Sequence, residues 1–131
     1  MSFLALNPAA GQILQGHINQ SQRCVVLLDS SGSVRGKEEQ VKVLLKKYAP
    51  LLVITFGDHK IERHERLEKY KPFGNTPMRD ALKYCMDNQL PAKKVYVLTD
   101  GKDTGSKTTT VQLIEQMSHS DIDFEFVGLD K

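Results

Sequence analysis

The sequence predicts an α/β fold, a Rossmann-like three-layer sandwich with a mostly parallel central sheet, one antiparallel edge strand and helices on both faces. Three observations lead to this prediction. Short apolar runs alternate along the chain with amphipathic stretches of helical period. Several of these runs are almost uniformly hydrophobic, as is typical of parallel strands buried on both faces. One charged segment follows a Gly57-Asp58 turn, which indicates a hairpin strand at the edge of the sheet.

The first half of the chain contains three predicted strands and one helix. The run from Cys24 to Leu28 predicts a central strand. From Val34 to Tyr48, apolar residues recur at positions i, i+3, i+4 and i+7, so a helix is expected there, and Pro50 ends it. The apolar run Leu51 to Phe56 predicts a second strand. The charged segment from Lys60 to Leu67 is expected to pair with it as the antiparallel edge strand.

The second half of the chain alternates two helices with two strands. Pro77 suits the first turn of a helix that runs to about Asn88, because the amide proton that proline lacks has no partner at that position anyway. Lys94 to Leu98 is expected to form a third core strand. A helix is expected from Thr108 to about His119, and the alternating residues Ile122 to Val127 predict the last strand. The order β-α-β-β-α-β-α-β is typical of a doubly wound sheet with right-handed crossovers.

We predict that residues 1–131 form a single domain, since this length is that of one ordinary domain. Its core is expected at residues 23–131 and its N-terminal extension at residues 1–22. Within the extension, residues 3–6 are expected to form a short strand and residues 9–19 a helix. The chain ends soon after the last predicted strand, so the extension is expected to cover part of the sheet.

The composition argues against two classes of partner. Lys and Arg number 18 against 16 Asp and Glu, so the net charge of +2 is too small to predict nucleic-acid binding. No apolar stretch approaches the length of a membrane span, and the N-terminus lacks the features of a signal peptide. Cys24 and Cys85 are expected to be free thiols. Together these features predict a cytoplasmic protein that uses neither nucleic acid nor a membrane.

Oxygen-bearing side chains occur in three loops that flank predicted core elements. Because ligands of open α/β sheets bind beyond the carboxyl ends of the strands, the side chains that follow two of these strands should lie close together. Carboxylates and hydroxyls, with no thiolate or imidazole, suit Mg²⁺, Mn²⁺ or Ca²⁺ and do not suit zinc. The sequence therefore predicts a metal site formed by Asp29, Ser31, Ser33, Thr76 and Asp100.

The predicted ligands also indicate what the metal would do. Three of them are neutral hydroxyls, so much of the charge of the cation stays uncompensated, and Mg²⁺ usually keeps several water ligands. A coordination position is therefore open to an outside carboxylate. Gly32, Asn75 and Lys102 lie in or beside the three loops and are expected to face a partner.

The pattern Asp29-x-Ser31-x-Ser33, then Thr76 before a helix, then Thr99-Asp100-Gly101 after a strand, resembles the von Willebrand factor A domain family. The resemblance spans roughly residues 22 to 129. It implies a metal-ion-dependent adhesion site on the same five residues, completed by an Asp or Glu of another protein. The chain departs from the family at its end, because family members usually continue through another strand and further helices.

Two other functions remain open at this point. Asp29-Ser30-Ser31-Gly32-Ser33 also has the outline of the Asp-x-Asp-Gly-Thr motif of haloacid dehalogenase-type phosphotransferases, with Asp100 and Asp103 as the later acidic pair. The match fails at Ser31, since a Ser hydroxyl cannot replace a carboxylic acid as proton donor near neutral pH. The second alternative is a scaffold with a purely structural metal. We favour a non-catalytic, metal-dependent protein–protein interaction module, because no activated nucleophile or general base is evident.

Overall fold

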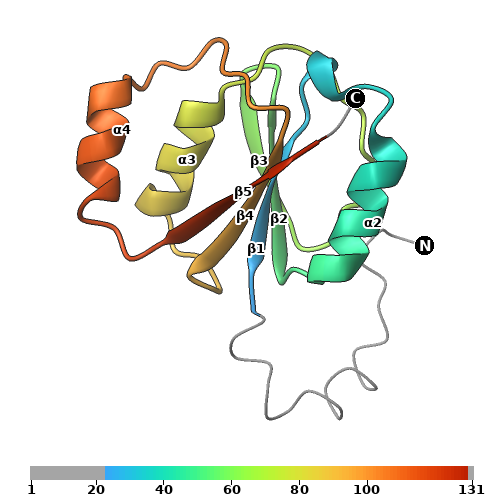
Figure 1. Cartoon of the computed structure of the whole chain (residues 1–131), viewed down its shortest axis with the longest axis horizontal. Coiled ribbons are helices and arrows are strands. Elements are labelled where there is room, and N and C mark those ends of the chain that lie inside the picture. Colours follow the sequence, from blue (N-terminus) through green and yellow to red (C-terminus); the bar gives the residue numbers. More distant parts are fainter. Residues whose placement is uncertain (1–22, 130–131) are drawn as a thin grey trace.

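The structure confirms the predicted α/β class and the single antiparallel edge strand. It is a computed structural model that describes residues 23–129, so the strand and helix expected at residues 3–6 and 9–19 lie outside the described residues. Figure 1 shows the sheet between helices on both faces. The elements in chain order are β1 (Val25–Asp29), the short 3₁₀ helix η2 (Gly32–Val34), α2 (Glu38–Tyr48), β2 (Leu52–Gly57), β3 (Lys60–His64), α3 (Met78–Asp87), β4 (Lys94–Thr99), α4 (Thr110–Met117) and β5 (Asp123–Gly128).

The strand order β3-β2-β1-β4-β5 places a topological switch point between β1 and β4. From β1 the chain first builds outward through β2 to the antiparallel β3, and it later adds β4 and β5 on the other side of β1. When two right-handed β-α-β connections move along the sheet in opposite directions, their helices lie on opposite faces of the sheet. Accordingly, α2 lies on one face and α3 and α4 on the other (Figure 1). The carboxyl ends of β1 and β4 are therefore neighbours, at the place where such folds bind ligands.

The core consists of two apolar layers separated by the sheet. Alternate residues of each strand face opposite layers, so Val25 and Leu27 of β1 pack toward α3 while Val26 and Leu28 pack toward α2. All five residues of β1 are buried, as are all six of β2. Burial on both faces explains why these two runs are nearly uniformly apolar in sequence. Because β1 is the central strand and is buried along its whole length, Asp29 at its carboxyl end has a fixed position.

Two predicted boundaries were wrong. The first helix begins at Glu38 and not at Val34, because Gly36 adopts a φ of +87° that interrupts helical geometry. Val34 instead ends η2 with its side chain fully buried. The charged edge strand ends at His64, three residues before the predicted Leu67, which leaves the sheet and is buried in the layer beneath α2. The other predicted elements agree with the structure to within about two residues at each end, as is usual for helix and strand limits.

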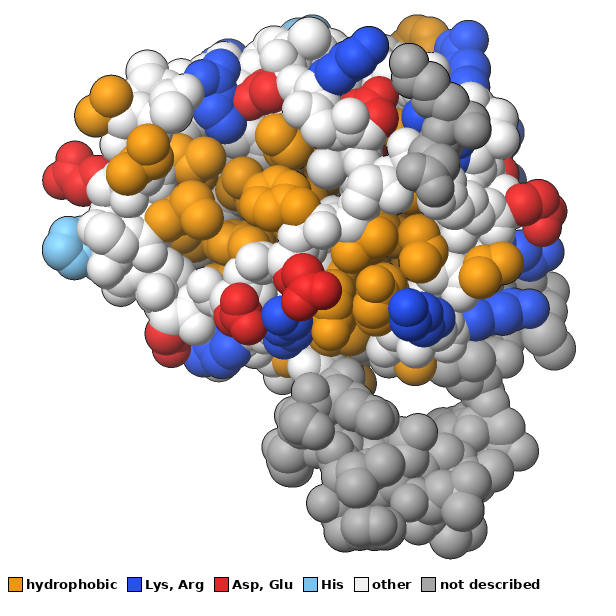
Figure 2. Space-filling model, in the orientation of Figure 1, with side chains coloured by type: hydrophobic (Ala, Val, Ile, Leu, Met, Phe, Trp, Pro, Cys, Tyr) orange, Lys and Arg blue, Asp and Glu red, His pale blue; other side chains and the backbone are white. Residues whose placement is uncertain are grey.

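The side of the molecule around β5 exposes several large apolar side chains. Of the apolar residues of α4, only Leu113 is buried, whereas Val111 and Ile114 are 74% and 62% exposed. Phe126 on β5, which lies at the edge of the sheet, is 52% exposed. Figure 2 shows hydrophobic side chains gathered over this face. The part of the chain that the structure describes thus leaves this edge of the sheet apolar.

None of the helices between residues 23 and 129 has the length and hydropathy needed to cross a membrane. Cys24 and Cys85 are both buried free thiols, as predicted. Burial raises the pKa of the Cys24 thiol to about 11 and that of the Cys85 thiol to about 12, so both are unreactive near neutral pH.

Candidate metal centre

The three predicted loops meet at the carboxyl end of the sheet. The amide of Gly32 in the first loop donates to the carbonyl oxygen of Gly74 in the second loop, at 2.9 Å. The amide of Thr104 in the third loop donates to the carbonyl oxygen of Thr76, at 2.8 Å. The second loop therefore lies between the other two and is joined to both by backbone hydrogen bonds. This arrangement explains how residues more than 70 positions apart can contribute to one site.

Two glycines permit close backbone contacts around the site, Gly57 with the first loop and Gly74 with the β2–β3 turn. A Cβ atom on Gly57 would lie 2.4 Å from the carbonyl oxygen of Ser30, and one on Gly74 would lie 2.5 Å from the Cα atom of Asp58. Gly74 also has a φ of +81°, which favours glycine. Ser30 is held on both sides, since its amide donates to the carbonyl oxygen of Phe56 and its carbonyl oxygen accepts from the amide of Phe73.

Asp29 is fully buried, and its carboxylate accepts three hydrogen bonds. Its Oδ1 atom accepts from the amide of Ser31 at 2.9 Å and from the Ser31 hydroxyl at 2.6 Å, and its Oδ2 atom accepts from the Thr99 hydroxyl at 2.8 Å. Burial raises the pKa of the Asp29 carboxyl group, while these hydrogen bonds act in the opposite direction. Asp29 thus orients Ser31 and links the ends of β1 and β4.

The serine hydroxyls continue this chain of polar contacts toward the surface. The Oγ atoms of Ser31 and Ser33 lie 2.9 Å apart, with Ser31 buried and Ser33 exposed. Ser33 lines the same pocket as Asp100, and an interaction with Ser33 is one of the causes that lower the pKa of the Asp100 carboxyl group. Asp29, Ser31 and Ser33 therefore form a hydrogen-bonded series from the core to the surface, where it reaches the pocket that Asp100 lines.

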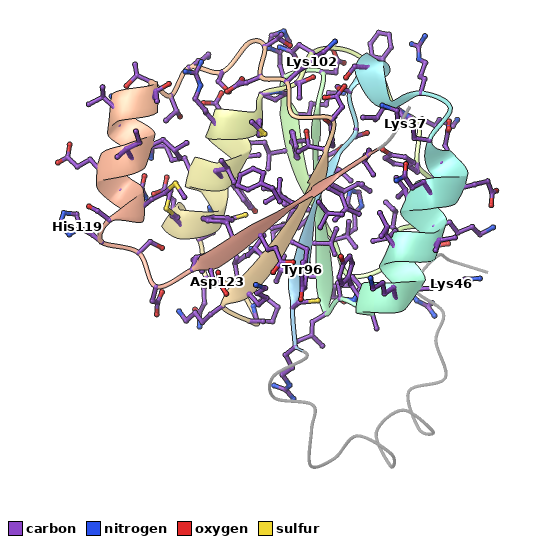
Figure 3. The ribbon with its side chains drawn as sticks, in the orientation of Figure 1. Lys37, Lys46, Tyr96, Lys102, His119 and Asp123 are labelled. Carbon is purple, nitrogen blue, oxygen red and sulfur yellow. The ribbon has the colours of Figure 1, made fainter. Side chains whose placement is uncertain are left out.

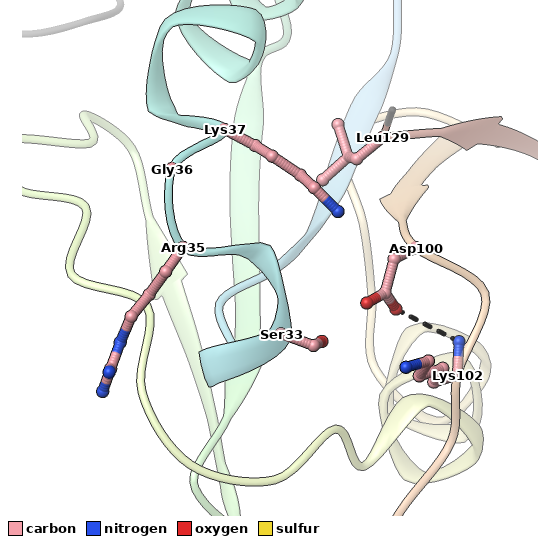
Figure 4. Close-up of a pocket in the computed structure, with 7 residues that line it drawn as sticks. All are labelled: Ser33, Arg35, Gly36, Lys37, Asp100, Lys102 and Leu129. Atoms are coloured by element: carbon pink, nitrogen blue, oxygen red, sulfur yellow. Dashed lines mark hydrogen bonds between the residues drawn. The ribbon is translucent and has the colours of Figure 1, made fainter. Parts of the chain in front are cut away.

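Asp100 lies at the open end of this series, beside a pocket. Burial alone would raise the pKa of its carboxyl group, but an interaction with the Ser33 hydroxyl and a hydrogen bond from the Lys102 amide, together with the charges of Lys37 and Lys102, hold the pKa below its usual range. Lys37 and Lys102 lie at the same end of the sheet (Figure 3). The pocket has a volume of about 440 Å³, and Figure 4 shows Ser33 and Asp100 on its wall. Asp100 is thus ionised near neutral pH and faces an accessible cavity.

Thr76, the fifth predicted ligand, is buried and held by the third loop. Its amide donates to the Thr104 hydroxyl at 2.9 Å, and its carbonyl oxygen accepts from the Thr104 amide. This places Thr76 between the loops that carry the other four residues.

The residues expected to face a partner differ in their surroundings. Gly32 is partly exposed in the first loop, and Lys102 is exposed beside Asp100. The side chain of Asn75 instead binds the β2–β3 turn, where its Oδ1 atom accepts from the amide of His59 at 2.7 Å and its Nδ2 atom contacts the His59 ring. Asn75 thus fastens the turn to the second loop, with His59 beside it at the rim.

Sequence reasoning missed three residues that support the site. Thr99 donates to Asp29, Thr104 holds Thr76, and the Tyr70 hydroxyl donates to the backbone carbonyl oxygen of Asp29. Thr99 could have been found, because parallel pairing of Leu28 with Leu98 places the next residues of β1 and β4 side by side. Tyr70 and Thr104 lie in loops without periodic patterns, and no sequence signal marked them.

The donor set has the chemistry of a site for a hard divalent cation. It is not a cluster of the usual charged or sulfur ligands, because between residues 23 and 129 no group of three or more His, Cys, Asp or Glu side chains is placed to hold a metal ion. The candidate set contains only two carboxylates and depends on hydroxyl oxygens for its other ligands, so it suits Mg²⁺, Mn²⁺ or Ca²⁺. Asp29 would support the hydroxyl ligands, whereas Ser33 and Asp100 would face the open side of the ion.

In comparisons with known proteins, the chain matches no protein-family model and no curated protein. The resemblance to von Willebrand factor A domains therefore rests on the motif residues and on the fold that positions them.

Proposed function

We propose that this protein is a non-catalytic, divalent-metal-dependent protein-binding module of the von Willebrand factor A type. In this proposal Asp29, Ser31, Ser33, Thr76 and Asp100 bind Mg²⁺, or Mn²⁺ or Ca²⁺ in its place. An Asp or Glu side chain of a partner protein occupies the remaining coordination position. Buried free thiols at Cys24 and Cys85 fit a reducing compartment, so we also propose a cytoplasmic location.

The observation that carries this proposal is the hydrogen-bonded series Asp29–Ser31–Ser33, which ends at an open pocket that Asp100 also lines. A purely structural metal would need no such opening. Hydroxyl ligands leave the cation electrophilic on its open side, and a carboxylate is the protein group best suited to bind there. Because the loops are joined by backbone hydrogen bonds, a partner would meet a largely preformed surface.

A phosphotransferase function is disfavoured by two contacts. Ser31 occupies the position where those enzymes need a second aspartate, and its hydroxyl is engaged by Asp29 and Ser33. Asp103, the second member of the required acidic pair, is instead paired with Arg79, with 2.6 Å between its Oδ2 atom and the Arg79 Nε atom. Phosphatase activity with Mg²⁺ that exceeds the activity of an Asp29→Asn variant would favour this alternative.

The test is partner capture from the native cell extract in the presence of Mg²⁺, followed by elution with EDTA. We expect binding to require the metal, and we expect amide substitution of one exposed acid of the partner to abolish it. Moderate salt should weaken binding only in part, since metal–carboxylate coordination is a short-range contact. Undiminished binding in EDTA would reduce the metal to a structural role.

A further inference from the structure

The pocket beside Asp100 has more positive charge than a site for one carboxylate requires. Its volume of about 440 Å³ lies within the range of small-ligand sites. Lys37 comes from the N-terminal end of α2 and Lys102 from the loop after β4, and both line the pocket together with Asp100. Figure 4 shows their side chains approaching Asp100 from different sides. Arg35 also lines the pocket, but its Nε atom donates to the carbonyl oxygen of Pro72.

In the metal-free protein the two lysines compensate the charge of Asp100. Both lysines line the same pocket as this carboxylate, and the Lys102 amide donates to its Oδ1 atom at 3.2 Å. A divalent cation held by Ser33 and Asp100 would take over this role, because it brings two positive charges much closer to the carboxylate. Asp29 and Asp100 bring two negative charges to the site, against two positive charges on the cation and one on each of the two lysines, so the site as a whole keeps an excess of positive charge. Lys37 and Lys102 are then left with positive charges that no group of the site neutralises.

We propose that this pocket binds a second acidic group, so that the partner presents two carboxylates a few bonds apart, one for the metal and one for Lys37 and Lys102. This proposal rests on the proposed function, since it concerns the same site. Leu129, which is almost fully buried, forms an apolar part of the pocket wall. It offers a surface for the aliphatic atoms that join the two carboxylates.

The proposal predicts opposite effects of each lysine on two ligands. A lysine repels the metal cation but attracts the second carboxylate, so removing its charge should strengthen the binding of Mg²⁺ and weaken that of a dicarboxylate. By linkage, the dicarboxylate should raise the affinity for Mg²⁺ by the same factor by which Mg²⁺ raises the affinity for the dicarboxylate. A lysine that is merely solvated would have neither effect.

The experiment titrates the full chain with acetate and with glutarate, each with Mg²⁺ and with EDTA, and follows binding by NMR of the ¹⁵N-labelled protein. Glutarate should bind about tenfold more tightly than acetate in Mg²⁺, which corresponds to about 1.4 kcal/mol. Lys37→Met and Lys102→Met should reduce glutarate binding to the level of acetate and raise the affinity for Mg²⁺ about two- to fivefold. Lys46→Met is the matched control, because Lys46 lies at the opposite end of α2 (Figure 3).

Different results overturn different claims. If acetate and glutarate bind equally in Mg²⁺, or if the two lysine variants keep the preference for glutarate, the second acidic subsite does not exist. If neither anion binds while Mg²⁺ does, the metal has no coordination position open to a carboxylate. The proposed function and the proposed second subsite are then both rejected. A blocked peptide with two Glu residues separated by one residue, compared with its Glu→Gln variant, distinguishes a polypeptide partner from a free dicarboxylate. If glutarate binds but the diacidic peptide binds no more tightly than its Glu→Gln variant, the claim that the partner is a protein is rejected.

Discussion

Asp29 and Asp100 stand at the ends of neighbouring parallel strands, yet their environments are opposite. Asp29 is fully buried and accepts hydrogen bonds from Ser31 and Thr99, and burial raises its pKa. Asp100 lines an open pocket, and its pKa is held below the usual range. For the proposed metal site, this comparison predicts a division of roles in which Asp29 supports the first loop and Asp100 contacts the ligand.

The difference follows from where the two strands end. The loop after β1 is enclosed by the end of β2, where Gly57 allows close approach to Ser30, and by residues 73–74 of the second loop, which are joined to it by backbone hydrogen bonds. The loop after β4 continues over the surface instead, and Gly101, Lys102, Thr104 and Gly105 within it are exposed. Two carboxylates of the same motif therefore experience very different desolvation.

The largest expected effect is the loss of stability in Asp29→Ala. This substitution leaves the amide and hydroxyl of Ser31 and the hydroxyl of Thr99 without their acceptor inside the core. We expect the free energy of unfolding to fall by about 2–4 kcal/mol, measured by denaturant unfolding without metal. Asp100→Ala should lower it by less than about 1 kcal/mol, because water can reach the partners of Asp100. Equal losses in the two variants would contradict the proposed division of roles.

The next effect concerns the metal. Wild-type protein in Mg²⁺ at about 100 times its dissociation constant should gain about 2.7 kcal/mol of stability by mass action. Asp100→Ala should abolish the accompanying rise in melting temperature while its metal-free melting temperature stays close to that of the wild type. Arg63→Ala is the control, because Arg63 is an exposed residue of β3 outside the three loops, and this variant should respond to Mg²⁺ like the wild type. A full response to Mg²⁺ in Asp100→Ala would exclude Asp100 as a ligand.

A smaller effect tests whether Asp29 is held by β4. Thr99→Val keeps the shape of the side chain but removes the hydroxyl that donates to Asp29, so unfolding should become easier by about 1–2 kcal/mol. The affinity for Mg²⁺ should also fall. Thr108→Val is the matched control, because the buried Thr108 hydroxyl donates to Asp80 at 2.7 Å in another part of the third loop. It should lower stability similarly without changing the affinity for Mg²⁺, and equal loss of affinity in both variants would argue against a specific role for Thr99.

The smallest effect is on the pH dependence of stability in the metal-free protein. The folded-state pKa of Asp100 is lowered, so its contribution to stability is present above the unfolded value of about 3.9 and is lost as pH falls through the folded pKa. The folded-state pKa of Asp29 is raised, so its ionisation lowers stability as pH rises from about 3.9 through the folded pKa.

Matched amide variants can separate these two titrations. Relative to the wild type, Asp100→Asn should lose less stability on acidification below about pH 4, and Asp29→Asn should lose less on raising the pH above about 4. The measurement is urea unfolding between pH 3 and pH 7 in EDTA. A pH dependence that changes in the same window and direction in both variants would remove the contrast between the two carboxyl groups.

The fold was predictable because its main signals are local. Runs such as Val25–Leu28 are apolar throughout, and parallel pairing then follows from the helices between the strands. The convergence of Asp29 with Asp100 followed from the same topology. The start of α2 was missed because the apolar periodicity continues through Val34, while a single backbone angle at Gly36 breaks the helix. Tyr70 was missed because its contact with Asp29 depends on the tertiary path of a loop that has no periodicity.

The close fit of Gly57 against the first loop would have a kinetic consequence for the proposed metal site. A Cβ atom on Gly57 would lie 2.4 Å from the carbonyl oxygen of Ser30, and the backbone hydrogen bonds of Ser30 hold the loop in place without an ion, so little chain reorganisation would have to accompany metal entry. If the site binds a cation as proposed, the slow event would be the loss of water from the hydrated ion, which Mg²⁺ releases reluctantly. The rate of metal binding would then vary with the identity of the ion more than with the viscosity of the solvent or with local chain motion.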